Sequence, residues 1–168
     1  LEYAAQGTTG YNFYDARGNL RSVLPYSLLR DNARRLAQCL SVFGLRRGSR
    51  VAIIADTSPE FIELFFACRY AGLVPFAMPV PVNLGSHGIY VQQLRGLLES
   101  SQASLALANL DYINFLEEAA EKVTALSWVG TPAQLSKFPV QEISLQSNEP
   151  DEVAYLQFTS GSTRMPRG

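Results

Sequence analysis

An uninterrupted apolar run at 51–55, followed at once by a helix-start signal, constrains the fold of this chain more than any other sequence feature. A strand with one solvated face alternates apolar and polar residues, whereas a continuous run is typical of a parallel strand covered on both faces. One of residues 56–58 can cap the helix that follows, and Pro59 suits its first turn. The stretch therefore predicts a strand–helix unit of a parallel sheet.

The same alternation continues along the chain. Further apolar strands are predicted at 73–78, 104–108, 125–129 and 153–158, and Pro75 is expected near a sheet edge or strand start. Helices are predicted to open at Pro25 and end at a left-handed Gly44, to run deeply buried from Pro59 to Gly72, to span 90–101, and to start after a capping Asp111. A hairpin over 11–24 precedes them, and 130–150 is expected to be an irregular polar connection. This order indicates an α/β fold with a mostly parallel sheet flanked by helices.

Composition narrows the function classes. The chain has 168 residues, 47% of them hydrophobic and 17% charged, which suits one domain with a sizeable core. Its net charge of -1 implies no basic face, so nucleic acid is not an expected partner. The longest apolar run, at 70–82, is interrupted by prolines and is too short to span a bilayer.

Cysteine and histidine offer little catalytic material. Cys39 and Cys68 each lie among apolar residues of a predicted helix, which favours buried thiols in a reducing cytoplasm over a disulfide or a zinc site. His87, the only histidine, lies in a predicted loop at 80–88. It could line a nucleotide or acyl site, but a solvated loop histidine is the favoured interpretation.

The end of the chain carries the strongest functional signal, because a run of small hydroxyl residues and glycine follows the apolar segment 153–158. Small residues let backbone N–H groups converge on an anion, hydroxyls add short-reach donors, and a guanidinium can bind phosphate through two donors. A phosphate-binding loop is therefore predicted. Its candidate ligand-binding residues are Thr159, Ser160, Gly161, Ser162, Thr163, Arg167 and Gly168.

Two alternatives bear on this loop. Serine, glycine and threonine taken alone are more often a flexible linker, but the ordered string directly after a strand favours a site. The Walker A pattern G-x-x-x-x-G-K-[ST] is not matched, because the order here is T-S-G-S-T-x-x-P-R-G.

That order resembles the phosphate-binding loop of the adenylate-forming enzymes, [ST]-S-G-[ST]-[ST]-G-x-P-K-G. Arg164, which stands where most of these enzymes have glycine, and the preceding segment 156–158 are similar to the fatty acyl-AMP ligases, with L-Q-[YF]-T-S-G-S-T and G-S-T-R-x-P. Arg167 replaces the usual lysine, so the charge is kept while a point charge becomes a planar fork.

Three further matches extend the resemblance over most of the chain. Gly44, Gly48 and 50–53 are similar to G-x-x-x-G-D-R-V-A-[IL], and 58–61 is similar to [NS]-S-x-[ED]-[FY]. Residues 71–75 resemble A-G-[AV]-[VI]-x-V-P, one residue tighter. Caps, a core strand and a turn explain all three, so we assign them no chemistry.

The resemblance implies a function. Fatty acyl-AMP ligases activate a fatty acid with ATP and Mg²⁺ to an acyl adenylate, then pass the acyl group to the phosphopantetheine of an acyl carrier protein. By this resemblance, the loop at 159–168 binds the β- and γ-phosphates, Ser162 or Thr163 donates a hydroxyl, and Arg167 neutralises charge. Residues 1–168 are expected to be the amino-terminal portion of a cytoplasmic AMP-binding domain of the acyl-CoA synthetase type, truncated just after the loop and inactive alone.

Two other interpretations stay open at this point. The chain could belong to an acyl-CoA ligase or an amino-acid adenylation domain, from which downstream sequence would separate it. It could also be a non-catalytic interaction module, because a sheet cut at this point would expose apolar area and favour self-association. Acyl chain length and pathway are left open by the sequence.

Overall fold

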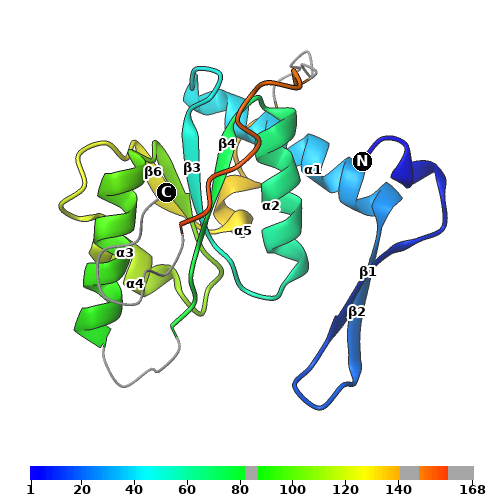
Figure 1. The fold of residues 1–168 in the computed structure, drawn as a ribbon, viewed down its shortest axis with the longest axis horizontal. Helices are drawn as coiled ribbons and strands as arrows, with labels where there is room; N and C mark the ends of the chain where they lie inside the picture. The colour runs from blue at the N-terminus through cyan, green and yellow to red at the C-terminus, as the bar shows by residue number, and fades with distance from the viewer. Residues whose placement is uncertain (82–86, 141–147, 159–168) are drawn as a thin grey trace.

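A four-stranded parallel sheet lies at the centre of the computed structural model, which describes residues 1–81, 87–140 and 148–158. The strand order is β4-β3-β5-β6 (Figure 1). The strands are β3 (Arg50–Ile54), β4 (Val74–Met78), β5 (Leu105–Leu107) and β6 (Trp128–Gly130). The predicted α/β fold with a parallel sheet is thereby confirmed.

Helices cover both faces of this sheet, as Figure 1 shows. On one face lie α1 (Tyr26–Leu40), α2 (Pro59–Tyr70) and α5 (Pro132–Leu135), and on the other lie α3 (His87–Ser101) and α4 (Ile113–Ala120). Within β3, Val51 and Ile53 pack toward the first group, while Ala52 and Ile54 pack toward the second. Because side chains alternate across a strand, only an apolar run can fill both layers, as the sequence predicted.

A two-stranded hairpin of β1 (Gly10–Tyr14) and β2 (Leu20–Pro25) projects beyond the sheet and follows a short 3₁₀ turn, η1 (Ala4–Gln6) (Figure 1). Pro25 does not open α1 as predicted. Its φ of -57° and ψ of 144° are extended, so it ends β2 and serves as the N-cap residue of α1. At the other end, the 3₁₀ turn η2 (Ser41–Phe43) prolongs α1, and Gly44 closes it with the expected left-handed φ of 59°.

Helix α2 begins as predicted, because the Ser58 Oγ accepts a hydrogen bond of 3.2 Å from the Phe61 N–H and Pro59 occupies the first turn. The prediction of deep burial is wrong for most of the helix. Only Leu64, Ala67 and Cys68 are buried, and the aromatic side chains are half-buried. The reason is that α2 packs on α1 and the sheet along one side, while its other side is covered only in part, by the hairpin cluster at Phe66 and by Tyr155 at Phe65.

Three downstream expectations need correction. Helix α4 has Tyr112 as its N-cap residue rather than Asp111, because a turn places both the Tyr112 and the Ile113 N–H groups on the Asn109 carbonyl. Strand β6 lies later than 125–129, since its register pairs Trp128 with Leu105. The connection at 130–140 is not irregular, because a capping box of Thr131 and Gln134 starts α5.

The predicted strand at 153–158 is present only as an isolated parallel bridge between Leu156 and Phe76. This bridge places the segment on the outer edge of β4, where Pro75 lies second in the strand, as an edge proline should. None of the helices among the described residues is long and apolar enough to cross a membrane.

Candidate functional site

The described chain ends at the carboxyl edge of the sheet, directly before the predicted phosphate-binding loop. The Leu156 N–H donates to the Pro75 carbonyl at 3.0 Å, and the Phe158 ring lies 4.7 Å from the Phe76 ring, centroid to centroid. Because the bridge to Phe76 is parallel, the chain here runs toward the carboxyl end of β4. Open parallel sheets bind ligands beyond the carboxyl ends of their strands. The predicted residues themselves, Thr159, Ser160, Gly161, Ser162, Thr163, Arg167 and Gly168, lie outside the described residues.

At the middle of this edge, the connections that follow two neighbouring strands lead to opposite faces of the sheet. Strand β3 leads into α2 on one face of the sheet, whereas its neighbour β5 leads into α4 on the other. Neighbouring strands whose connections leave to opposite faces form a crevice, and such switch points are the usual ligand sites of doubly wound sheets.

A polar network spans this switch point. The Asn109 Nδ2 donates to the Asp56 Oδ2 at 2.6 Å and to the Ser58 Oγ at 3.0 Å, and the Ser58 hydroxyl donates to the Asp56 Oδ1 at 2.8 Å. Since Ser58 also accepts from the Phe61 N–H, its one donor and both lone pairs are used. Ser58 is therefore a structural hydroxyl rather than a nucleophile. Sequence reasoning missed Asn109, although a polar residue directly after a buried strand is a usable signal.

Two hollows open along the same edge. One of about 270 Å³ lies beside Asn109 and Thr131 and is bounded by Glu60 at the start of α2. The other, about 790 Å³, lies between the hairpin and the β3–α2 connection and is lined by Phe13, Arg21, Thr57 and others. Neither hollow was predicted, because each is formed by segments far apart in the sequence.

His87 is the first residue of α3 rather than part of a loop. Its Nε2 lies 2.5 Å from the Glu118 Oε2, and its ring lies 4.9 Å from the Phe115 ring. The side chain is more than half exposed. These contacts link α3 to α4 at the surface, in agreement with the solvated interpretation.

The thiols are unsuited to chemistry. Cys39 and Cys68 are both buried and free, and burial raises the pKa of the Cys68 thiol to about 12. A thiol is a nucleophile or metal ligand only as thiolate, so Cys68 stays inert near neutral pH. Within the described ranges, the acidic, histidine and cysteine side chains form no group of three that could hold a metal ion.

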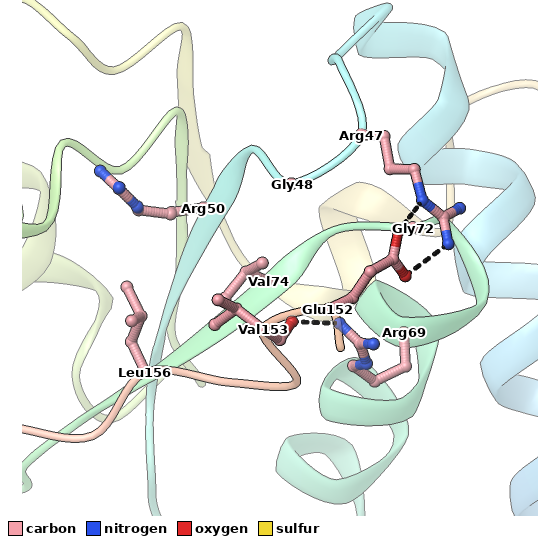
Figure 2. A pocket seen from close by; sticks show the side chains of 9 residues that line it. All are labelled: Arg47, Gly48, Arg50, Arg69, Gly72, Val74, Glu152, Val153 and Leu156. Atoms are coloured by element: carbon pink, nitrogen blue, oxygen red, sulfur yellow. Dashed lines mark hydrogen bonds and ion pairs between the residues drawn. The ribbon is translucent and has the colours of Figure 1, made fainter. Parts of the chain in front are cut away.

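Charged residues surround a further cavity of about 380 Å³ at the opposite, amino-terminal end of β3 and β4 (Figure 2). There Arg47 forms a two-point ion pair with Glu152, with Nε–Oε1 and Nη2–Oε2 distances of 2.5 and 2.6 Å. The Arg47 guanidinium lowers the pKa of the Glu152 carboxyl to about 2. Sequence analysis singled out neither residue, since 105 positions separate them.

Arg69 lies beside this pair. Its Nη1 donates to the carbonyls of Leu73 and Val153 at 3.2 and 3.0 Å, and its Nη2 donates to the Asn148 Oδ1 at 2.6 Å. Burial lowers the pKa of the Arg69 guanidinium. Arg69 therefore joins the end of α2, the start of β4 and the terminal segment.

The profile of the AMP-binding enzymes matches residues 2–168. This chain belongs to the AMP-binding enzyme family. Its members are also called adenylate-forming enzymes, and one solved structure with this fold, an O-succinylbenzoate coenzyme A synthetase from Bacillus subtilis that is 20% identical, is a complex with ATP and a magnesium ion.

Individual relatives point to two subfamilies. A Caulobacter vibrioides protein named as an acyl-CoA synthetase is 38% identical over this whole chain, which covers 29% of that protein. A chain solved in studies of fatty acyl-adenylate ligases from E. coli and L. pneumophila is 40% identical, with a TM-score of 0.92 over 99% of this chain and 30% of its own. A Moorena producens medium-chain-fatty-acid–[acyl-carrier-protein] ligase is 31% identical over 86% of this chain and 25% of its own length.

The chain spans less than a third of these proteins. The comparisons establish an adenylate-forming ligase family and its amino-terminal fold, and they divide between CoA synthetases and acyl-adenylate ligases.

Proposed function

We propose that this chain is the amino-terminal portion of a fatty acyl-AMP ligase, which converts a fatty acid and ATP to an acyl adenylate and pyrophosphate. The observation that carries the proposal is the string T-S-G-S-T-R-x-P-R-G after an L-Q-F segment. The likeness to fatty acyl-adenylate ligases, at 40% identity, supports it. The Moorena relative supports an acyl carrier protein as the acceptor.

In this proposal the loop at 159–168 binds the β- and γ-phosphates. Backbone N–H groups of Gly161 and its neighbours converge on the phosphate oxygens, Ser162 or Thr163 donates a hydroxyl, and Arg167 supplies positive charge. Bound Mg²⁺ would neutralise further charge on the phosphates. The described residues fit this role, because Leu156 and Phe158 bring the chain to the carboxyl edge of the sheet.

An acyl-CoA ligase is the second candidate, and the Caulobacter relative favours it. Both functions share the adenylation step and differ in the acceptor of the acyl group. This chain covers 29% of the Caulobacter relative and 30% of the solved fatty acyl-adenylate ligase chain. We therefore propose that residues 1–168 alone do not form acyl adenylate.

The test is ATP–pyrophosphate exchange with a panel of fatty acids and amino acids, measured on the full-length protein that contains this chain and on residues 1–168. Each reaction is run with CoA, with a phosphopantetheinylated carrier protein, and with neither acceptor. Exchange by the full-length protein, accumulation of acyl adenylate and transfer to the carrier protein but not to CoA are expected.

Acyl-CoA formation would transfer the assignment to the CoA ligases. Exchange with amino acids alone would indicate an adenylation domain of that specificity. No exchange with any acid would overturn the enzyme assignment and favour an interaction module. Substantial adenylate formation by residues 1–168 would contradict their proposed insufficiency.

A further inference from the structure

We propose that Arg47, Arg69 and Glu152 form a positioning clamp that fixes the register of the terminal segment 148–158 on the edge of β4. By fixing that register, the clamp sets the point and direction in which the chain enters the phosphate-binding loop, and so tunes the affinity for ATP. The nucleotide part of this inference rests on the proposed function, whereas the register part rests on the contacts themselves.

The backbone pairing of the terminal segment with β4 is weak. Among the described residues, the segment has one bridge to the sheet, between Leu156 and Phe76, with one backbone hydrogen bond to Pro75. A strand at the centre of a sheet forms a ladder of backbone hydrogen bonds with a neighbour on each side, whereas the described part of this segment forms with β4 the one bond to Pro75. A single backbone hydrogen bond contributes little net stability, so the backbone pairing alone holds the register weakly.

A cavity lies between the terminal segment and the sheet. The 380 Å³ space shown in Figure 2 is bordered by Val74 on β4 and by Val153 and Leu156 on the segment. Close packing would lock these side chains together, but here they border open space. The apolar contacts of the segment lie further along, where the Tyr155 ring lies 5.9 Å from the Phe65 ring and where Leu156 and Phe158 pack against the core.

The contacts of the clamp are directional and hold neighbouring residues of the segment. Two parallel hydrogen bonds join the Arg47 guanidinium to the Glu152 carboxylate, a pairing that is directional as well as charged. Arg69 adds the bond to the Val153 carbonyl, next along the chain. Two consecutive residues of the segment are thus held, one by its side chain and the other by its backbone, as the dashed lines of Figure 2 show.

Register matters because a slip of one residue exchanges the two faces of a strand. In the observed register Leu156 and Phe158 face the core, while Gln157 is exposed. A slip would bring Gln157 inward and turn both apolar side chains out. It would also move Phe158, the last described residue, by one strand position.

The charges of Arg47, Arg69 and Glu152 favour a persistent contact between the terminal segment and the sheet. Glu152 is the carboxylate that pairs with Arg47, and the half-buried Arg69 makes no ion pair within the described residues, bonding instead to two carbonyls and an amide. A partly desolvated guanidinium holds such acceptors firmly, since leaving it without them is costly. The clamp lies at the amino-terminal end of β4, away from the proposed phosphate site, so these three are positioning residues.

The test uses the full-length protein and the variants Arg47→Ala, Glu152→Ala, their double variant and the charge reversal Arg47→Glu with Glu152→Arg. Arg46→Ala, in the same turn and exposed, is the matched control. Two quantities are measured: the KM for ATP and kcat in pyrophosphate exchange, and amide hydrogen exchange of the peptide containing Leu156. Thermal unfolding reports any general loss of structure.

Each single variant is expected to raise the KM for ATP about fivefold, with kcat and the unfolding midpoint close to wild type. The double variant is expected to be no worse than either single variant, because both remove the same contact. Charge reversal is expected to recover part of the loss. The Leu156 amide should exchange faster in the single variants than in wild type or Arg46→Ala.

Leu156 exchange that is unchanged in the variants would overturn the register part, whatever the kinetics. Faster exchange with an unchanged KM for ATP would overturn the link to nucleotide binding. A fall in kcat and in the unfolding midpoint with constant KM would show a merely structural role. No pyrophosphate exchange by the wild-type protein would overturn the proposed function and the nucleotide part with it, while hydrogen exchange would still decide the register part.

Discussion

Strand β3 and the terminal segment 148–158 are both apolar in part and both pair with β4, yet the structure holds them in different ways. Strand β3 has hydrogen-bonded neighbours on each side and helices on each face, and Val51 to Ile54 are all buried. The terminal segment has one bridge, two aromatic contacts and the clamp of Arg47, Arg69 and Glu152.

The two regions owe their register to different interactions. Burial on two faces makes the register of β3 a consequence of its own residue pattern. The terminal segment, at an edge, depends on side chains that are 84 and 105 positions away in sequence. Disturbing the core should therefore change stability, and disturbing the segment should change ligand binding.

The largest expected effect is on stability, from Leu105→Ala in β5. Leu105 is fully buried between the sheet and α1, α2 and α5, so the substitution should lower the free energy of unfolding by about 2–5 kcal/mol. Urea denaturation measures the change. Leu20→Ala, at a side chain that is 54% exposed, is the control and should stay within about 0.5 kcal/mol of wild type. Equal effects of the two substitutions would contradict the assigned core.

The next effect concerns the proposed phosphate loop. Arg167→Ala in the full-length protein should weaken transition-state stabilisation by about 1–3 kcal/mol, because one charge-assisted phosphate contact is lost. Pyrophosphate exchange at limiting ATP measures this loss, and Arg17→Ala in the hairpin turn is the control. An unchanged rate would remove Arg167 from the phosphate site. An unfolding midpoint that falls with the rate would assign it to the fold instead.

The smallest effect is a local titration at the clamp. The pKa of Glu152 is lowered from 4.5 to about 2 by Arg47, so the ionised, paired form is favoured in the folded protein. The stabilisation from this pair is then complete above about pH 4.5 and is lost as the pH falls toward 2. NMR titration of the Glu152 carboxyl carbon should show the low midpoint in wild type. In Arg47→Ala the midpoint should return toward the ordinary glutamate value.

A wild-type Glu152 midpoint near the ordinary glutamate value of 4.5 would contradict a persistent clamp. The same result in Arg47→Ala and wild type would show that another group holds the carboxylate. Either outcome would show that the edge segment does not depend on the Arg47–Glu152 ion pair in the way proposed.

Sequence reasoning performed best where a signal was local. The Ser58–Pro59 helix start, the left-handed Gly44 and the apolar β3 are confirmed, because caps, turns and two-sided burial each depend on neighbouring residues. It failed where composition hid a local motif, as at Thr131 and Gln134, whose capping box lies in a polar stretch. The phosphate-loop residues stay a prediction, because they lie outside the described residues.

The α/β class, the parallel sheet and a loop pattern that resembles the adenylate-forming enzymes could all be predicted from the order of the residues. The tertiary structure alone decided the strand order, the network of Asp56, Ser58 and Asn109, and the pairing of Arg47 with Glu152. The difference arises from how far apart the interacting residues lie along the chain. Backbone conformation and burial follow from residues a few positions apart, whereas an ion pair across 105 positions forms only after the sheet has brought its partners together.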